Sequence, residues 1–370
     1  MSSGVACVGR RLVSVGASAA LVVAACSVAG APPASAAVFE VTITTDGGAG
    51  SLRDAFVQAS ASAEANEIIL APGATYVLDD CGEGDLDYTG SEPLTITGNG
   101  ATIEQQCDER VIETDGDLVV TDARITGGDE SGGLGGGIEA DTNRVTLVRS
   151  TVAGNTASTG GGVAAIRVTL VDSTVSGNSA TSTAGGIWVD QTLDATNSTI
   201  TGNSAGTAGG GVAVVNTSIT LLYSTVVGNT APTGANLQLQ AGSDALVSFG
   251  TVVGGPLGGG SDCAIDAGAA TTSQGSNFSS DASCGFGAGA GDIVGGGDPG
   301  VGALAANGGP TATMLPQATS PLIDAADCAA APAAVTADQR GVARPQGGAC
   351  DIGAVEVEAI AVPLDPSFTG

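Results

Sequence analysis

A six-residue phrase recurs four times in the chain with small changes, and it constrains the fold more than any other feature. It is STVAGN at 150–155, STVSGN at 173–178, STITGN at 198–203 and STVVGN at 224–229, so its glycines are 23, 25 and 26 residues apart. Self-similarity at a period of roughly 20–50 residues is typical of solenoids and other repeat architectures. The phrase therefore predicts a chain of stacked, nearly identical units.

Apolar residues recur at fixed positions before each glycine of the phrase, and the residues between them are mostly polar or small. Alternation of this kind has the period of a β-strand. A unit of ~25 residues cannot bury its own apolar face, but stacked units can bury theirs against one another. The pattern predicts an all-β parallel β-helix with coils ~4.8 Å apart. The register extends one coil earlier, to Gly127 of the related segment ITGG, so each column has five members. The apolar columns, at nine, seven and two residues before the glycine, are Leu118, Val145, Val168, Leu193 and Ile219; Val120, Leu147, Leu170, Ala195 and Leu221; and Ile125, Val152, Val175, Ile200 and Val226.

Stacking would place the last residue of every phrase in one column at a turn. The glycine before it permits a positive φ at that corner. Amide side chains in such a column can satisfy turn backbone groups and each other. We therefore interpret the phrase as scaffold, with an asparagine ladder formed by Asn155, Asn178, Asn203 and Asn229.

The first 36 residues have the features of an export signal. An arginine pair at 10–11 precedes an apolar run over 12–25, and Ala34-Ser35-Ala36 is a small-x-small cleavage site, so we expect cleavage after Ala36. The segment VAAC ending at Cys26 resembles a bacterial lipoprotein box, which leaves a lipid on Cys26 as an alternative, and the arginine pair also permits twin-arginine export. No later stretch reaches ~18 uninterrupted apolar residues, so we expect no transmembrane segment after signal removal. We expect an extracellular protein, secreted or associated with the cell surface.

The six cysteines after residue 36 indicate disulfides, because an even number in an exported chain is typical of them. The cysteines fall into three sequential pairs, and the two members of each pair are separated by about one coil. Residues one coil apart are ~4.8 Å apart, within the Cα range of a disulfide. We predict the pairs Cys81–Cys107, Cys263–Cys284 and Cys328–Cys350.

The ends of a β-helix expose strand edges, and edges are usually capped. Ser51 is a candidate N-cap with Asp54 three residues later, followed by an apolar face suited to cover the first coil. Strands are expected at 67–70 and 75–78. We divide the chain into a signal peptide (1–36), an N-terminal cap with the first coils (37–110), regular coils (111–258), a C-terminal β-helix and cap region (259–357) and a tail (358–370).

Segments at both ends resemble a known family. GSLRDAF at 50–56, followed by ANEIILAPGATYVL at 65–78, resembles bacterial surface β-helix proteins with a "CSLREA" motif, with Gly50 in place of the cysteine. NGGPTATML (307–315), SPLIDA (320–325) and DQRGVARPQGGACDIGAVE (338–356) resemble the choice-of-anchor β-helix family, in which a shared ectodomain is joined to differing surface anchors.

The resemblance covers about residues 40–357. It implies a pectin-lyase-like β-helix on an exported protein. Together with the helix start at Ser51 and the cysteine pairs, it leads us to expect a right-handed parallel β-helix with an N-terminal capping helix and an irregular, disulfide-stapled C-terminal region. It implies no known reaction. The chain departs from the family at its end, where no sorting motif or terminal hydrophobic helix precedes Gly370.

The composition excludes several function classes. The net charge is −28, and the chain has neither lysine nor histidine. Such an excess of acid argues against a nucleic-acid partner, because few residues could neutralise phosphates. The absence of histidine removes Ser–His and Cys–His nucleophile pairs and imidazole metal ligands.

Polar residues in two columns are the candidates for ligand binding. If they face outward, they could bind sugar hydroxyls or uronate carboxylates. The alternative is a cross-strand charge ladder worth about a few tenths of a kcal/mol per pair. The candidates are Asp122, Arg149, Asp172 and Tyr223 at five residues before the glycine, and Arg144 and Arg167 at ten.

The acidic segment at 79–87 is the best metal candidate, because calcium requires only oxygen ligands. Its spacing matches no EF-hand loop, and a solvated acidic loop is the alternative. We expect no cofactor other than calcium. The candidate ligands are Asp79, Asp80, Glu83, Asp85 and Asp87.

A further column, at three residues before the glycine, contains only threonine in the four phrases. Threonine arrays on flat solenoid faces resemble those of ice-binding proteins. The column two residues later is broken by Ala153 and Val227, which argues against that function. The threonines are Thr151, Thr174, Thr199 and Thr225.

These features predict an exported, non-catalytic β-helix ectodomain that contacts polysaccharide or another cell surface, as an adhesin does. The alternative is a polysaccharide-active enzyme on the same fold, a calcium-assisted lyase or a glycoside hydrolase. An inverting hydrolase needs two carboxylates ~6.5–9.5 Å apart. Asp172 and Asp194 lie on adjacent coils but in different columns, so no catalytic residue is assigned.

Overall fold

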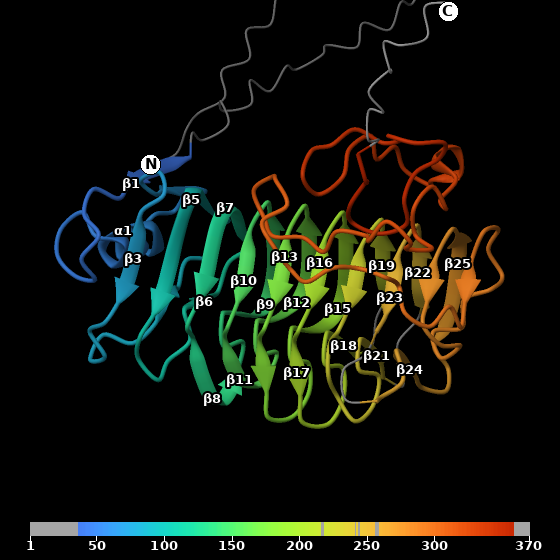
Figure 1. Ribbon diagram of the computed structural model, residues 1–370. Helices are drawn as coiled ribbons and strands as arrows, with labels where there is room; N and C mark the ends of the chain where they lie inside the picture. Colours follow the sequence, from blue (N-terminus) through green and yellow to red (C-terminus); the bar gives the residue numbers. More distant parts are fainter. Residues whose placement is uncertain (1–35, 216–217, 241, 243–244, 256–258, 359–370) are drawn as a thin grey trace, which may run out of the picture. The chain divides into compact units, whose positions relative to one another are not determined.

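The computed structural model describes residues 36–215, 218–240, 242, 245–255 and 259–358. These residues form a parallel β-solenoid of about nine turns (Figure 1). The expected signal peptide up to residue 35, the alternative lipid site at Cys26 and the tail after residue 358 lie outside the described residues. Among the residues with a described structure, none of the helices has the length and apolarity that a membrane span requires.

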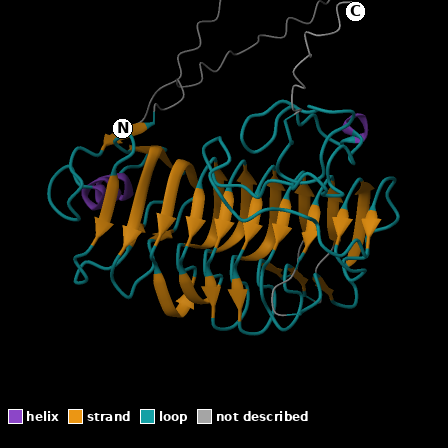
Figure 2. Ribbon diagram, viewed as in Figure 1, coloured by secondary structure: helices purple, strands orange, loops and turns teal. Residues whose placement is uncertain are grey.

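Short strands dominate the described chain, with one α-helix near its N-terminal end (Figure 2). The elements are, in chain order, β1 (Ala37–Glu40), α1 (Leu52–Ser60), β2 (Asn66–Ile69), β3 (Thr75–Leu78), β4 (Leu86–Tyr88), β5 (Leu94–Gln105), β6 (Ile112–Thr114), β7 (Leu118–Thr126), β8 (Asp129–Leu134), β9 (Ile138–Val148), β10 (Thr151–Ala153), β11 (Thr156–Thr159), β12 (Val163–Val171), β13 (Thr174–Ser176), β14 (Ser179–Ala180), β15 (Ile187–Thr196), β16 (Thr199–Thr201), β17 (Ser204–Ala205), β18 (Val212–Val214), β19 (Ser218–Leu222), β20 (Thr225–Val227), β21 (Leu237–Leu239), β22 (Ala245–Phe249), β23 (Val252–Gly254), β24 (Cys263–Ile265), β25 (Ala270–Gly275), β26 (Phe278–Ser279), β27 (Ile293–Val294) and a 3-10 helix η1 (Cys328–Ala330).

Strands of successive coils pair with one another in parallel, which confirms the predicted parallel β-helix. The phrase strands β10, β13, β16 and β20 stack with their threonines in register. The longer strands β9, β12, β15 and β19 stack in the same way. The short strands β8, β11, β14 and β17 form a separate sheet. Residues about 25 positions apart are therefore direct neighbours, as the repeat implies.

The predicted apolar columns form the core between the sheets. All fifteen of their residues are at most 1% exposed. They belong to one continuous hydrophobic cluster that runs from the N-terminal cap to the last coils. The positions that alternate with them face outward, as the period of two requires; they include Thr146, Thr169 and Thr220.

The residues five before each phrase glycine occupy a corner of the coil and not a flat strand face. Their φ angles are 50° at Asp122, 47° at Arg149, 51° at Asp172, 45° at Asn197 and 46° at Tyr223. Asparagine and aspartate adopt this left-handed conformation readily, whereas arginine and tyrosine rarely do. The column therefore marks where each coil changes direction, and its side chains project from an edge.

The serine at the start of each phrase stabilises this corner through hydrogen bonds. The Ser173 hydroxyl donates to the carbonyl of Val171 (2.8 Å), and it accepts from the backbone N–H of Ser150 one coil earlier (3.2 Å). Ser198 makes the same contacts one coil later. The phrase thus carries a serine ladder, a role that the sequence pattern had not suggested.

The asparagines of the phrase form a buried ladder. The side-chain amide of Asn155 donates to Oδ1 of Asn178 (3.0 Å), which also accepts the backbone N–H of Asn155 (3.0 Å). Asn178, Asn203 and Asn229 continue the pattern. The next coil has glycine at the expected position, and the amide of Asn229 donates instead to Asn236 from the adjoining column (3.0 Å). Asn236 then donates to Oδ1 of Asp262 (3.2 Å).

Asp262, the carboxylate at the end of this ladder, is expected to make stability depend on pH. Burial, followed by the charge of Asp281, raises the pKa of Asp262 from 3.8 to about 6. A raised carboxyl pKa favours folding at low pH, so stability falls as pH rises from about 4 to about 6, by up to ~3 kcal/mol. We expect Asp262→Asn to flatten this fall in the melting temperature. Asp298→Asn, at an exposed carboxylate, is the control and should keep the wild-type profile; identical profiles for both variants would contradict the assignment.

The N-terminal cap is the helix α1. The Ser51 hydroxyl accepts from the N–H of Asp54 (3.1 Å), and the apolar face of the helix, including Leu52 and Phe56, is buried against the first coils. Gly50 has a φ of +84°, and a Cβ there would lie 2.4 Å from Oγ1 of Thr42. The side chain of Thr42 would have to move to admit the cysteine of the related motif.

The irregular segment 299–357, here the C-terminal cover, packs on the phrase strands. Thr174 donates to the carbonyl of Ala312 (2.7 Å), and Thr199 donates to Gln339 (2.7 Å). Thr174, Thr199 and Thr225 are at most 3% exposed. The last three threonines of the column are therefore an internal contact surface and not an exposed array, whereas Thr151 is only partly buried.

Three disulfides are present among the described residues, and each joins two cysteines that are about one coil apart in sequence. Their Cα–Cα distances are 5.4, 4.9 and 5.4 Å. The first holds an early coil, the second the last coils, and the third the C-terminal cover. The pairs are Cys81–Cys107, Cys263–Cys284 and Cys328–Cys350.

Candidate functional site

A groove of about 540 Å³ opens where the C-terminal cover ends and the earlier coils are left uncovered. Its floor comes from the corner column and the strands beside it, and its wall comes from the cover. The volume is within the range of ligand sites. The groove is lined by Asn99, Gly100, Ala101, Thr102, Asp122, Ala123, Arg124, Arg149, Thr151, Thr174, Ser176, Leu304, Pro310 and Ala312.

The groove contains a two-pronged ion pair between adjacent corners. Nε and Nη2 of Arg149 donate to the two carboxylate oxygens of Asp122, at 2.8 and 2.7 Å. The side chains are 44% and 34% exposed, so a ligand can reach both. The hydrogen bond to Asp122 raises the pKa of Arg149 above its usual value. Paired arginine and carboxylate groups can bind several sugar hydroxyls at once.

Arg124 and Thr151 extend the polar floor. They are register neighbours on β7 and β10, one coil apart. Arg124 is exposed and forms no ion pair with any residue that the structure describes. Opposite them, Leu304, Pro310 and Ala312 form an apolar wall. The groove thus has one polar and one apolar side.

Asp172 and Tyr223, two further candidates of the corner column, lie under the C-terminal cover. Asp172 accepts from the side chain of Asn197 (3.3 Å), and burial raises its pKa. Tyr223 is 1% exposed and packs edge-on to Phe249, with the guanidinium of Arg344 4.5 Å from its ring centroid. The tyrosine is therefore a core residue, and the expectation that it faces a ligand is wrong.

Arg144 and Arg167 lie away from the groove. They are register neighbours on β9 and β12, in a column at the start of the second half of each strand. Five residues separate Arg144 from the corner at Arg149, which is roughly 16 Å at ~3.3 Å per residue. The predicted patch is thus two separate groups of side chains.

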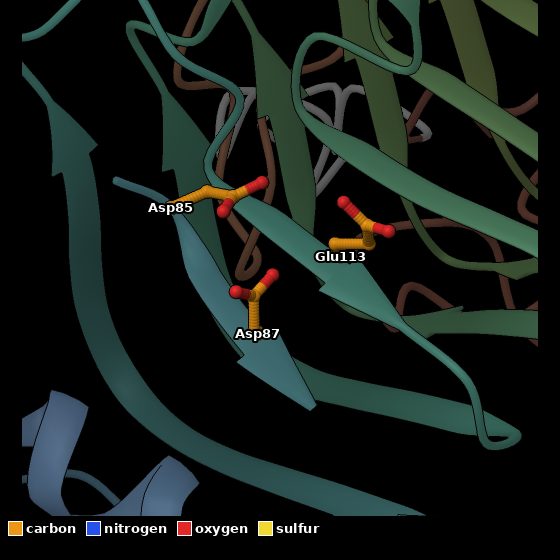
Figure 3. A group of neighbouring side chains, drawn as sticks. All are labelled: Asp85, Asp87 and Glu113. Atoms are coloured by element: carbon orange, nitrogen blue, oxygen red, sulfur yellow. The ribbon is translucent and has the colours of Figure 1, made fainter. Parts of the chain in front are cut away.

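The acidic segment contributes two residues to a cluster of three carboxylates (Figure 3). Oxygen atoms of Asp85, Asp87 and Glu113 lie within 4.8 Å of one another. Asp87 on β4 and Glu113 on β6 are register partners. The sequence pattern missed Glu113, although its distance of 26 residues from Asp87 equals that of the first cysteine pair.

The other candidates of the acidic segment do not join this cluster. Asp80 accepts from the N–H of Gly82 (3.2 Å), which is a local turn contact. The carbonyl of Glu83 accepts from the guanidinium of Arg53 (3.1 Å), which also bonds the carbonyls of the next two residues. Asp79 is exposed. The five predicted ligands therefore do not share one site.

Arg110 lies among these carboxylates. It contacts Asp85 (3.3 Å) and Glu113 (3.0 Å), and it forms a close ion pair with Glu139. Burial, followed by the charge of Asp87, raises the pKa of Asp85 to about 7, although Arg110 opposes the shift. Three oxygen ligands on two coils could contribute to a calcium site. The guanidinium already supplies a positive charge there, so a cation would have to compete with it.

The charged residues of the C-terminal motif form a buried internal network. Arg340 donates to the carboxylate of Asp338 (2.8 Å). Arg344 donates to Glu356 (2.9 Å), and both side chains are at most 1% exposed. Gln339 donates to Thr174 on the coils (2.9 Å). The motif therefore joins the cover to the solenoid and leaves no charged group for a ligand.

Comparisons with known proteins add no relative. No protein-family model, curated protein or solved structure matches the chain. Functional inference therefore depends on the residues of the groove and of the coil surface.

Proposed function

We propose that this chain is an exported β-helix ectodomain that binds a polysaccharide in the groove without cleaving it. The observation that carries the proposal is the groove itself, with the Asp122–Arg149 pair in its floor and the C-terminal cover as its wall. The described disulfides support export, because such bonds persist in oxidising compartments.

The two-sided character of the groove suits a sugar. Hydroxyl groups can bind the carboxylate and guanidinium groups of the floor, and Thr151 adds a hydroxyl on the next strand. The C–H faces of a sugar ring can pack on Leu304 and Pro310. Floor residues recur at each coil, ~4.8 Å apart, so contacts can repeat along a polymer.

The same groove supports binding rather than hydrolysis. Asp122 is the one carboxylate among its lining residues, and both of its oxygens are engaged by Arg149. Glycoside hydrolysis ordinarily uses two carboxylates on either side of the bond to be broken.

Filling the groove is expected to abolish binding. Thr151→Trp places a large side chain on the groove floor, and we expect the dissociation constant for a bound polysaccharide to rise at least about tenfold, or ~1.4 kcal/mol. The matched control is Thr146→Trp, on an outward position of β9 that does not line the groove. The measurement is affinity electrophoresis or calorimetry across neutral, uronate and sulfated polysaccharides. No binding by the wild type, or equal loss in both variants, would overturn the proposal.

A second candidate function, polysaccharide cleavage, is favoured by one observation. Asp85 has a pKa raised to about 7 and lies beside Asp87, which is the kind of pair that divides acid and nucleophile roles. The protein would be incubated with the same polysaccharides, with and without calcium. Release of reducing ends or of unsaturated product would indicate cleavage, and its absence would favour binding alone.

A further inference from the structure

The arginines of the described chain fall into two sets. Arg53, Arg110, Arg340 and Arg344 are held inside, with side chains at most 13% exposed, and each pairs with carboxylates. The other set of described arginines faces outward from three consecutive coils, on or directly after β7, β9 and β12. We name this outward set the arginine track; it consists of Arg124, Arg144, Arg149 and Arg167.

Arg144 and Arg167 are adjacent like charges. They are direct register partners, ~4.8 Å apart across the strands, and like charges in this arrangement repel. Within the described ranges, neither guanidinium forms an ion pair with a carboxylate. Asp117 precedes them in the column, but its carboxylate accepts the backbone N–H of Arg144 (2.9 Å). Thr192, the next register partner, brings no charge.

This arrangement is unusual for a chain with 38 acidic and 10 basic residues. Carboxylates are abundant enough to pair every arginine, and the internal set is paired. Three members of the track, Arg124, Arg144 and Arg167, have no such partner among the residues described. An anion supplied from outside would relieve the repulsion of the adjacent pair.

We propose that the arginine track binds an anionic polysaccharide, with Arg144 and Arg167 as a second anion subsite beyond the groove. The inference rests on the proposed function, and it names carboxylate or sulfate groups on the polymer as the ligand chemistry. Guanidinium groups bind such groups through two parallel hydrogen bonds. The roughly 16 Å between Arg144 and Arg149 exceeds the reach of one charged group, so a polymer is needed to engage both ends.

The test uses the chain from Ala37 onward and matched polymer pairs. Polygalacturonate is compared with its methyl ester, and dextran sulfate with dextran. The double variant Arg144→Gln with Arg167→Gln is compared with Ser179→Glu combined with Thr233→Glu, which changes net charge equally at exposed positions of other columns. We expect about tenfold weaker binding of a charged polymer by the arginine variant alone. Melting temperatures establish that both variants fold.

The outcomes separate this inference from the proposed function. Loss confined to the charged polymers, with the sulfate and carboxylate arms showing which group is preferred, supports the track. Equal binding of charged and neutral polymers, unaffected by the arginine variant, overturns the track and leaves the groove. Single-stranded DNA that binds as tightly as polygalacturonate, and is lost in the same variant, overturns polysaccharide as the partner. Failure of every polymer to bind the wild type overturns the proposed function itself.

Discussion

Arg344→Gln is expected to destabilise the protein by about 3–5 kcal/mol, because it leaves a buried carboxylate without its partner. The Arg344 guanidinium donates to Glu356 (2.9 Å) and to the carbonyls of Asp351 (3.1 Å) and Gly353 (2.7 Å). It also lies over the ring of Tyr223, which belongs to the coils. The substitution therefore weakens both the C-terminal cover and its contact with the solenoid.

The free energy of unfolding in denaturant measures this loss, and hydrogen exchange locates it. We expect faster exchange in the cover than in the coils. Arg124→Gln, at an exposed arginine without an ion pair among the described residues, is the control and should change stability by less than about 0.5 kcal/mol. Arg344→Met combined with Glu356→Gln removes both charges and should recover part of the stability. Equal effects of Arg344→Gln and Arg124→Gln would contradict the assignment.

Asn203→Ala is expected to cost about 2–4 kcal/mol, because it interrupts the asparagine ladder at its middle. The Asn203 amide donates to Oδ1 of Asn229 (3.0 Å) and to the carbonyl of Val175 (3.0 Å). Its Oδ1 accepts two hydrogen bonds from Asn178 (3.0 and 2.9 Å). Asn203 is fully buried, so water cannot replace these partners.

Stacked coils contact only their neighbours, so this substitution tests cooperativity as well. We expect a lower denaturant concentration at the unfolding midpoint. If the coils on either side then unfold separately, the free energy of unfolding should also depend less steeply on denaturant concentration. Ser204→Ala changes the exposed next residue and should have little effect. A ladder that contributes nothing would show as equal midpoints for Asn203→Ala and Ser204→Ala.

The candidate site was predictable only in part. The corner column pointed to Asp122 and Arg149, which do line the groove. The same column also pointed to Tyr223, which is buried, because a pattern of outward positions cannot show what covers them. Thr151 belongs to a column that had suggested an exposed array, whereas the cover buries its later members. Glu113 belongs to the acidic cluster because it lies one coil after Asp87, and only that offset could have identified it from the sequence.

The sequence by itself determined the coil, the core positions, the asparagine column and the cysteine pairs of this protein. Each of these depends on contacts between residues about one repeat apart, and such contacts are visible as a period in the chain. Only the tertiary structure decided the left-handed corners, the site of the groove and which threonines of the phrase strands stay exposed. The site of the groove and the burial of the later phrase threonines depend on the C-terminal cover, whose Gln339 meets Thr174 across 165 residues. No period relates two such segments, so their contact followed from packing and hydrogen bonding that the repeat does not encode.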